Sequence, residues 1–171
     1  HTAYRRQRQM CIRDRSGSDW GSDGFHGFKV RIVDGAGNAS QFSTEQRVSI
    51  DTVAPVAAVL TAVGDGNVNA AEKLGSTIVR ISHEAATAGS VVQLWRDSDL
   101  VRSVSVSAGV RATAITLTGN DWGSEGEHAF KARLVDGAGN IGAWSAVQTV
   151  KVASAAPAAV TWGTLATDSM V

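Results

Sequence analysis

The amino-acid sequence predicts an all-β fold in which antiparallel β-sandwiches follow one another in tandem. Three observations support this. A block of 37 residues recurs after 102 residues, the segments between turns are short and rich in β-branched residues, and no segment is long enough for a substantial helix. A period of about one hundred residues is too long for a solenoid unit and matches one immunoglobulin-like (Ig-like) sandwich.

The repeated block divides the chain. It runs over residues 19–55 and again over residues 121–157, with 20 identical residues in the 37 positions. We therefore expect function to belong to the array of repeats. The predicted segments are residues 16–51 as the end of a first repeat, 52–55 as a linker, 56–152 as a complete repeat, 153–156 as a second linker and 157–171 as the start of a third repeat.

Residues 1–15 share no pattern with the rest of the chain, and their composition differs from it. They hold the only Cys and five of the sixteen Lys and Arg residues. Back-translated, they resemble the transposon-end adapter used to prepare sequencing libraries. We interpret them as an artefactual leader without structure. The alternative is a basic arm for nucleic acid or membrane.

Without residues 1–15, 11 basic residues face 15 acidic ones, and the formal net charge falls from zero to −4. An acidic chain argues against a nucleic-acid partner. The sequence contains no apolar run of about 18 residues, the length that would predict a membrane-spanning helix. No Cys remains for a disulfide, which is weakly typical of an exported protein.

Seven runs separated by Gly, Asn, Asp and Ser are the predicted strands of the complete repeat. One run shows a clear two-residue period, since His128, Phe130 and Leu134 share one face with Ala132 while Lys131 and Arg133 lie on the other. The first face is the predicted core. A single helical turn is expected at residues 69–73. The predicted strands are residues 56–63, 76–82, 90–96, 100–105, 111–118, 127–135 and 143–152.

The sequence Asp-Gly-Ala-Gly-Asn at residues 136–140 predicts a tight hairpin, because Gly permits positive φ and Asp and Asn bond their own backbone. This turn, Ile-Asp-Thr-Val-Ala-Pro at 50–55 and Gly-Asp-Gly-Asn-Val-Asn-Ala-Ala-Glu at 64–72 together resemble the bacterial Ig-like repeats of giant surface adhesins. The resemblance covers the chain after Arg15. It implies an extracellular or cell-surface filament that carries a terminal binding tip and whose joints often rely on calcium.

Two sets of side chains are candidate ligands for Ca²⁺, the one cofactor we consider. Asp65, Asn67, Asn69 and Glu72 match the second half of an EF-hand-like loop, whose first half is missing. The alternative, which we favour, is a turn in which Asn69 caps a short helix and Glu72 closes a capping box. Sandwich topology could bring Asp121 and Glu125 near Asp65.

The second set lies where the linker enters the complete repeat, since the hairpin at residues 136–140 belongs to that pole. Asp136 and Asn140 would approach Asp51, and a shared calcium ion would lock the angle between repeats. In the second linker Ala153 replaces Asp51, which argues against the same ion there. The alternative for Asp34 and Asp136 is turn chemistry alone.

Ring-bearing residues carry the remaining hypotheses. His26 and His128 begin equivalent strands on the core face, where a ring tip bonds backbone upstream. The recurrence of Trp20, Trp122 and Trp144 (opposite Phe42) favours packing in the core or at a domain joint. Trp95 alternates with Leu94, so if Leu94 faces the core, Trp95 faces solvent as a platform for carbohydrate. It is the predicted ligand-binding residue.

The sequence predicts no enzyme. His83 and Glu84 open like a zinc-protease helix, but Thr87 stands where the second His is needed. The leading hypothesis is a structural spacer of an adhesin whose partners are neighbouring repeats of the same chain. The alternatives are a module that binds host or matrix glycans, and an accessory repeat of a secreted enzyme.

Overall fold

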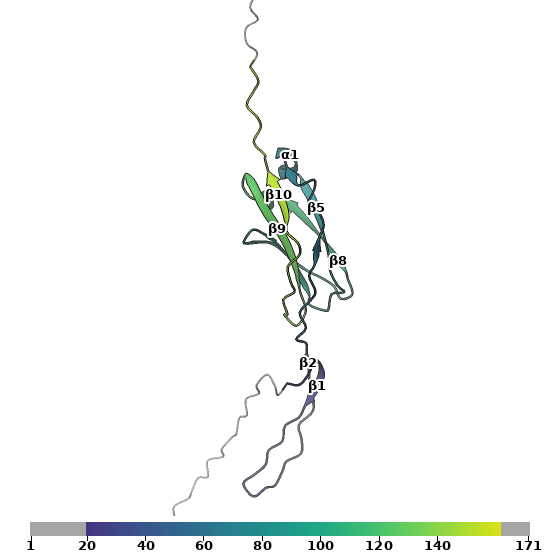
Figure 1. Cartoon of the computed structure of the whole chain (residues 1–171). Coiled ribbons are helices and arrows are strands. Elements are labelled where there is room, and N and C mark those ends of the chain that lie inside the picture. Colours follow the sequence, from purple (N-terminus) through teal and green to yellow (C-terminus); the bar gives the residue numbers. More distant parts are fainter. Residues whose placement is uncertain (1–19, 162–171) are drawn as a thin grey trace, which may run out of the picture. The chain divides into compact units, whose positions relative to one another are not determined.

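The computed structural model describes residues 20–161. The predicted leader and the end of the predicted third repeat lie outside these residues. The chain divides into two compact units, His1–Val53 and Ala54–Val171. Each unit has its own paired strands (Figure 1).

Short strands joined by tight turns make up the second unit, with only one α-helix and one 3₁₀ helix among its described residues. The elements are β3 (Val59–Leu60), β4 (Asn67–Val68), α1 (Ala70–Leu74), β5 (Ser76–Ser82), β6 (Val91–Arg96), β7 (Asp99–Ser105), β8 (Ala112–Thr118), the 3₁₀ helix η2 (Gly119–Trp122), β9 (Gly126–Val135) and β10 (Gln148–Val152).

Two sheets form the sandwich of this unit. One has the order β3-β5-β8 and the other the order β4-β10-β9-β6-β7. All pairs are antiparallel except β4 with β10. Figure 1 shows β9 and β10 on one side and β5 and β8 on the other. The sheet of β3, β5 and β8 thus opposes the sheet that contains β6, β7, β9 and β10, which confirms the predicted Ig-like all-β sandwich.

The core lies between the two sheets, and β9 shows why the register is unique. Phe130, Ala132 and Leu134 are buried, whereas Lys131 and Arg133 are partly exposed, as predicted. Val79, Ile81, Ile115 and Leu117 belong to the same core cluster from the opposite sheet. Fully burying one such side chain contributes roughly 1.5–3 kcal/mol. A shift by one residue would exchange these apolar side chains for charged ones.

The first and last strands are shorter than predicted. The predicted strand at residues 56–63 is regular only at β3, and the predicted strand at residues 143–152 is regular only from Gln148, where β10 begins. Before β10, Ser145 both donates its N–H to the Ala132 carbonyl, at 2.8 Å, and accepts the Ala132 N–H with its hydroxyl, at 3.0 Å. A side chain therefore takes the place of one backbone acceptor, and the regular ladder starts later.

The helical turn lies where it was predicted, shifted by one residue. Asn69 is the N-cap of α1, and the helix continues to Leu74. The sequence did not indicate β4 or η2. β4 is a two-residue strand held by its parallel pairing with β10. η2 follows β8 directly and buries Asp121 and Trp122.

The first unit is a β-hairpin. β1 (Gly24–Phe28) pairs antiparallel with β2 (Gln46–Ile50). The hairpin continues beyond β1, because Ser43 donates its N–H to Val30 and Ser40 donates to Ile32, each at 2.8 Å. It closes at the bridge between Val33 and Ala39.

Candidate functional site at the linkers and loops

One carboxylate holds the chain where it leaves the complete repeat. Ser154, two residues after β10, donates its N–H to the two carboxylate oxygens of Glu125, at 3.1 and 2.9 Å, and its hydroxyl donates to the same group. The hydroxyl hydrogen bond is the main cause that lowers the pKa of Glu125, and the Ser154 N–H and Lys73 contribute less. Lys73 Nζ of α1 lies 3.9 Å from Glu125 Oε1.

The same contact recurs in the first unit, 102 residues earlier. Asp23 Oδ1 accepts the Thr52 N–H at 3.2 Å and the Thr52 hydroxyl at 2.8 Å. Asp23 and Thr52 are the repeat equivalents of Glu125 and Ser154. We call each pair a linker clamp, because it ties the first residues after the last strand of a unit to the corner that precedes β9 in the second unit and β1 in the first.

The linker clamps were not predicted from the sequence, since neither position is identical between the repeats. Both positions nevertheless carry chemically conservative changes, Asp to Glu and Thr to Ser, at a constant separation of 29 residues. An acid and a hydroxyl that keep one separation in two repeats are a usable signal for such a contact.

The candidate calcium loop at Asp65 is a capped turn. Asn69 Oδ1 accepts the N–H groups of Ala71 and Glu72, at 2.9 and 3.1 Å, and Glu72 Oε2 accepts the Asn69 N–H at 2.9 Å. Asp65 Oδ1 accepts the Asn67 N–H at 2.8 Å. The capping box is confirmed. These oxygens accept backbone hydrogen bonds, and the binding of calcium by Asp65, Asn67, Asn69 and Glu72 stays a prediction.

The additional acidic residues near this pole have other partners. α1 and the corner after β8 do share the pole, as the contact between Lys73 and Glu125 shows. Asp121, however, is buried and accepts hydrogen bonds from Arg102 Nη2, at 2.5 Å, and from the Thr118 N–H, at 2.9 Å. Arg102 neutralises this carboxylate, and Glu125 belongs to the linker clamp.

The predicted hairpin at residues 136–140 is confirmed. Asp136 Oδ1 accepts the N–H groups of Ala138 and Asn140, and Asp136 Oδ2 accepts the Asn140 side-chain amide, all at 2.9 Å. Burial opposes ionisation of Asp136, but the hydrogen bonds from the Asn140 side chain and backbone outweigh it and lower the pKa. This is the turn chemistry of the alternative interpretation.

Asp34 in the first unit makes the same three hydrogen bonds, at the same distance, to Ala36 and Asn38. The Asn38 side-chain amide is the main cause that lowers the pKa of Asp34. Asp51 lies in the first unit and Asp136 in the second. Asp51 Oδ1 accepts the Val53 N–H at 3.2 Å. The shared calcium site of Asp51, Asp136 and Asn140 stays a prediction.

Both histidine rings bond the backbone upstream, as predicted. His26 Nε2 lies 2.6 Å from the Ser22 carbonyl oxygen, and His128 Nε2 lies 3.0 Å from that of Ser124. His128 has a second partner, since its Nδ1 lies 2.7 Å from Asp97 Oδ2. Asp97 lies in the turn between β6 and β7, so this bond joins two hairpins.

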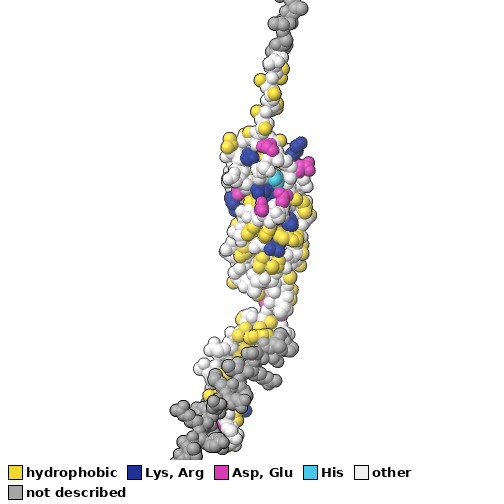
Figure 2. All heavy atoms as spheres, turned by 90° about the vertical axis from the view of Figure 1, so that its left-hand side faces the viewer, with side chains coloured by type: hydrophobic (Ala, Val, Ile, Leu, Met, Phe, Trp, Pro, Cys, Tyr) yellow, Lys and Arg dark blue, Asp and Glu magenta, His cyan; other side chains and the backbone are white. Residues whose placement is uncertain are grey.

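An aromatic and cationic patch covers the outer face of the five-stranded sheet. We define it as Gln93, Trp95, Lys131, Arg133 and Trp144. The two Trp rings meet edge to face with centroids 5.7 Å apart. Gln93 Oε1 accepts the Arg133 Nε–H at 2.8 Å and the Trp95 indole N–H at 3.4 Å. Figure 2 shows Lys and Arg side chains among hydrophobic ones on this side.

Cations lie against both rings of the patch. Arg133 Cζ is 4.4 Å from the Trp144 centroid and 5.5 Å from that of Trp95, and Lys131 Nζ is 4.5 Å from that of Trp144. Leu94 is buried and Trp95 is half-buried, which agrees with the predicted alternation. Its role as a ligand-binding residue stays a prediction.

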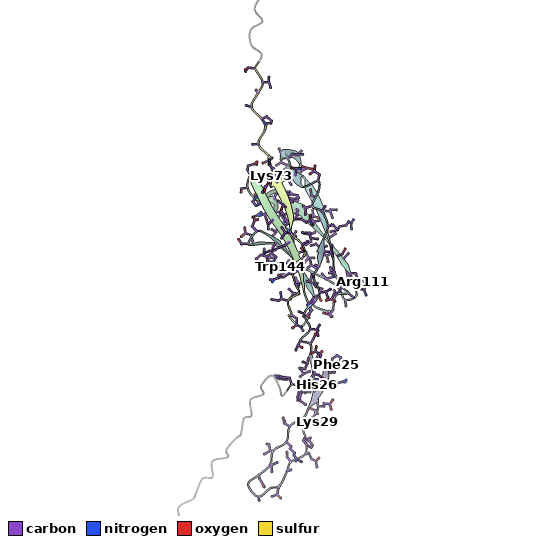
Figure 3. The ribbon with its side chains drawn as sticks, in the orientation of Figure 1. Phe25, His26, Lys29, Lys73, Arg111 and Trp144 are labelled. Carbon is purple, nitrogen blue, oxygen red and sulfur yellow. The ribbon has the colours of Figure 1, made fainter. Side chains whose placement is uncertain are left out.

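The recurring Trp side chains differ in burial. Trp122 is buried in the core, as expected, but Trp144 is 38% exposed on the side of β9 and β10 (Figure 3). Arg31 lies 5.0 Å from the ring of Phe42, the repeat equivalent of Trp144. The aromatic side chain therefore recurs as a partner for Arg on the outer face and not as a core residue.

Among residues 20–161, no group of three or more His, Cys, Asp or Glu side chains is placed to hold a metal ion. Within the same residues, no helix has the length and apolar character needed to cross a membrane.

No protein-family model and no curated protein sequence matches the chain. Among solved structures, it is similar to an ice-binding, Ca²⁺-stabilized adhesin of an Antarctic bacterium (23% identity, 83% of this chain, 35% of that chain, TM-score 0.44). It is also similar to the fibronectin(III)-like modules of Clostridium thermocellum CbhA (17% identity, 78% of this chain, 64% of that chain, TM-score 0.45).

A third similar structure is a bacterial immunoglobulin-like domain from the M. primoryensis ice-binding adhesin (18% identity, 59% of this chain, 100% of that chain, TM-score 0.40). The chain thus spans about a third of the Antarctic adhesin chain and about two thirds of the CbhA modules. The TM-scores lie below 0.5, so the fold assignment rests on the strand order and core of this chain.

Proposed function

We propose that this chain is a spacer segment of a bacterial surface or secreted adhesin, in which Ig-like repeats set the distance between the cell and a binding tip. The observation that carries the proposal is the linker clamp at the end of both repeats. A chain that only needed flexible tethers between domains would have no use for it.

The linker clamps shorten the mobile part of each linker. Thr52 is followed by Val53, Ala54 and Pro55, and Ser154 by Ala155, Ala156 and Pro157. Proline restricts its own φ and keeps the residue before it extended. A linker held at one end and stiffened by proline at the other has few free dihedral angles. Reach would then grow with the number of repeats.

Small-angle X-ray scattering on one to four concatenated copies of residues 54–155 would test the spacer function. The maximum dimension should grow by a similar increment for each added copy. In a matched series with Glu125→Ala in every copy, the increment should shrink and the distance distribution should broaden. Collapse of the parent series into compact particles would contradict the proposal.

Calcium stiffening is a separate part of the proposal and concerns Asp51, Asp136 and Asn140, with Asp65, Asn67, Asn69 and Glu72 as the second set. Excess calcium should raise the melting temperature of residues 16–171 above its value in chelator. Asp51→Ala should abolish this increase if the ion lies at the joint, and Asp65→Ala if it lies in the loop. An identical melting temperature in calcium and in chelator would contradict calcium stiffening, and the linkers would then be held by the linker clamps without an ion.

The aromatic and cationic patch favours a second function, the binding of host or matrix glycans at Trp95. Among residues 20–161, Lys131 and Arg133 form no ion pair, so the patch suits an acidic sugar. An oligomer of a uronic acid should shift the NMR signals of the Trp95 indole, and a neutral oligomer should not. Trp95→Ala should remove the binding, with Trp20→Ala as the control.

An accessory role in a secreted enzyme stays open as the third hypothesis. The proposal assigns no catalysis to residues 16–171, so the active site would belong to another part of the parent protein. Sequencing of the parent gene on both sides distinguishes a catalytic domain from further repeats and a binding tip.

A further inference from the structure

The first unit exposes apolar side chains whose repeat equivalents are buried. Val30 and Ile32 are 73% and 77% exposed. Their equivalents in the complete repeat, Ala132 and Leu134, are 0% and 1% exposed. Soluble domains rarely leave such a row of large apolar side chains in water.

Local geometry does not explain this difference, because the two hairpins are built alike. Val30 accepts the Ser43 N–H at 2.8 Å and donates its own N–H to the Ser43 hydroxyl at 3.1 Å. Ala132 and Ser145 make the same two bonds, at 2.8 and 3.0 Å. The backbone already holds Val30 and Ile32 in the positions that their equivalents occupy in the core.

Both units also contain the same pair of aromatic rings in contact. Trp20 and Phe28 meet edge to face with centroids 5.8 Å apart, as Trp122 and Phe130 do at 6.1 Å. Trp122 and Phe130 are fully buried, whereas Trp20 is 38% exposed. The same aromatic pair is present in both units, and only the second unit covers it.

The complete repeat shows what covers these positions. β9 pairs with β10 along one edge and with β6 along the other, while the sheet β3-β5-β8 lies across its apolar face. Among the described residues, β1 pairs only with β2. The first unit therefore has both an open strand edge and an open apolar face, in the places that β6 and the opposite sheet fill in the second unit.

We infer that the hairpin of residues 20–50 binds the front half of an Ig-like sandwich, supplied by a repeat of the same kind. The strand equivalent to β6 pairs with the open edge of β1, and the sheet equivalent to β3-β5-β8 covers Phe28, Val30 and Ile32. The partner forms backbone hydrogen bonds along the open edge and buries the apolar face at the same time. Only one register of the paired strands does both.

The test adds this partner to the chain. Residues 1–18 are replaced by a second copy of residues 54–120, so that Asn120 is followed by Asp19 as it is by Asp121 in the complete repeat. Hydrogen exchange at the N–H groups of residues 28–33 and the Trp20 emission spectrum are compared with those of residues 16–171. We expect exchange to slow by at least tenfold, the emission to shift to shorter wavelength, and the protein to be monomeric.

Two substitutions on opposite faces of the strand test whether the apolar face is the one that is covered. In the extended protein, Val30→Asp places a charge on the covered face and should abolish the slow exchange and the blue shift. Lys29→Gln changes the neighbouring residue, whose side chain is on the other face, without placing a carboxylate beside its ion-pair partner Glu45, and should leave both unchanged. Equal effects of the two substitutions would overturn the inference.

A mismatch between the borrowed front half and this hairpin is controlled by a second extended protein. It carries Val30→Ala and Ile32→Leu, which restore the residues found at positions 132 and 134. If exchange stays fast and Trp20 stays exposed in both extended proteins, the inference is wrong. It is also wrong if residues 16–171 alone form a dimer in which Trp20 is already buried, since a second hairpin would then be the partner.

Discussion

The hairpin of the first unit and its equivalent in the second unit have the same turn but different strands. In both, one Asp accepts two backbone N–H groups and one Asn side chain at 2.9 Å. Yet β9 extends over ten residues and β1 over five. The difference shows that the turn and the histidine bond follow from local sequence, whereas strand length and burial follow from the strands that pack against the hairpin.

The largest difference between the two hairpins should come from removing an equivalent aromatic ring. Phe130→Ala should lower the free energy of unfolding of the second unit by about 3–5 kcal/mol, because Phe130 is fully buried against Trp122. Phe28→Ala should leave this transition unchanged. Chemical denaturation of residues 16–171 measures both, and equal losses would remove the distinction between the hairpins.

An equivalent glycine gives a second, smaller difference. A Cβ at Gly137 would lie 1.8 Å from the Ala88 carbonyl oxygen, whereas a Cβ at Gly35 has no atom within 4 Å. Neither glycine has a positive φ. Gly137→Ala should therefore cost about 1–3 kcal/mol through overpacking. Gly35→Ala should cost nothing in the same denaturation experiment, and a loss there would reveal a partner for the first turn.

Acid should affect both turns alike and more weakly. Hydrogen bonds lower the pKa of Asp34 and Asp136 in the folded chain. The carboxylates thus stabilise the turns above the ordinary Asp pKa of about 3.9, and this contribution is lost as the pH falls through the lowered value. NMR titration of the Asn38 and Asn140 side-chain amides should give two similar curves, both with midpoints below that of an unstructured Asp. A midpoint at the ordinary Asp value in only one of the turns would mean that its carboxylate does not accept these hydrogen bonds, so that the two turns differ.

The smallest effect on stability is expected for the linker clamps. The pKa of Glu125 is lowered, so the clamp is present above the ordinary Glu value of about 4.3 and opens as the pH falls through the lowered one. Glu125→Gln should leave the melting temperature nearly unchanged but increase fast backbone motion at Ser154, measured by NMR relaxation. Asp23→Asn should do the same at Thr52. Unchanged motion in both variants would mean that the linkers are held by other contacts.

The sequence predicted those parts of the fold that short-range patterns encode. The alternation at residues 128–134 placed the core face of β9 correctly, and Asn69 with Glu72 indicated the capping box. It did not predict β4, because that strand consists of two residues held by pairing with β10. Trp144 is not a core residue, because recurrence shows that a side chain is used without showing on which face it packs, and its packing at a domain joint stays a prediction.

The repeat, the turns and the alternation of apolar residues can be inferred from the sequence, since they depend on the conformational preferences of neighbouring residues and on the pleat of one strand. The packing of the folded chain brings Glu125 to Ser154, Arg102 to Asp121 and two cations to the ring of Trp144. These contacts join residues from separate strands and corners. Their distances are determined by how two sheets pack, and no local preference encodes them.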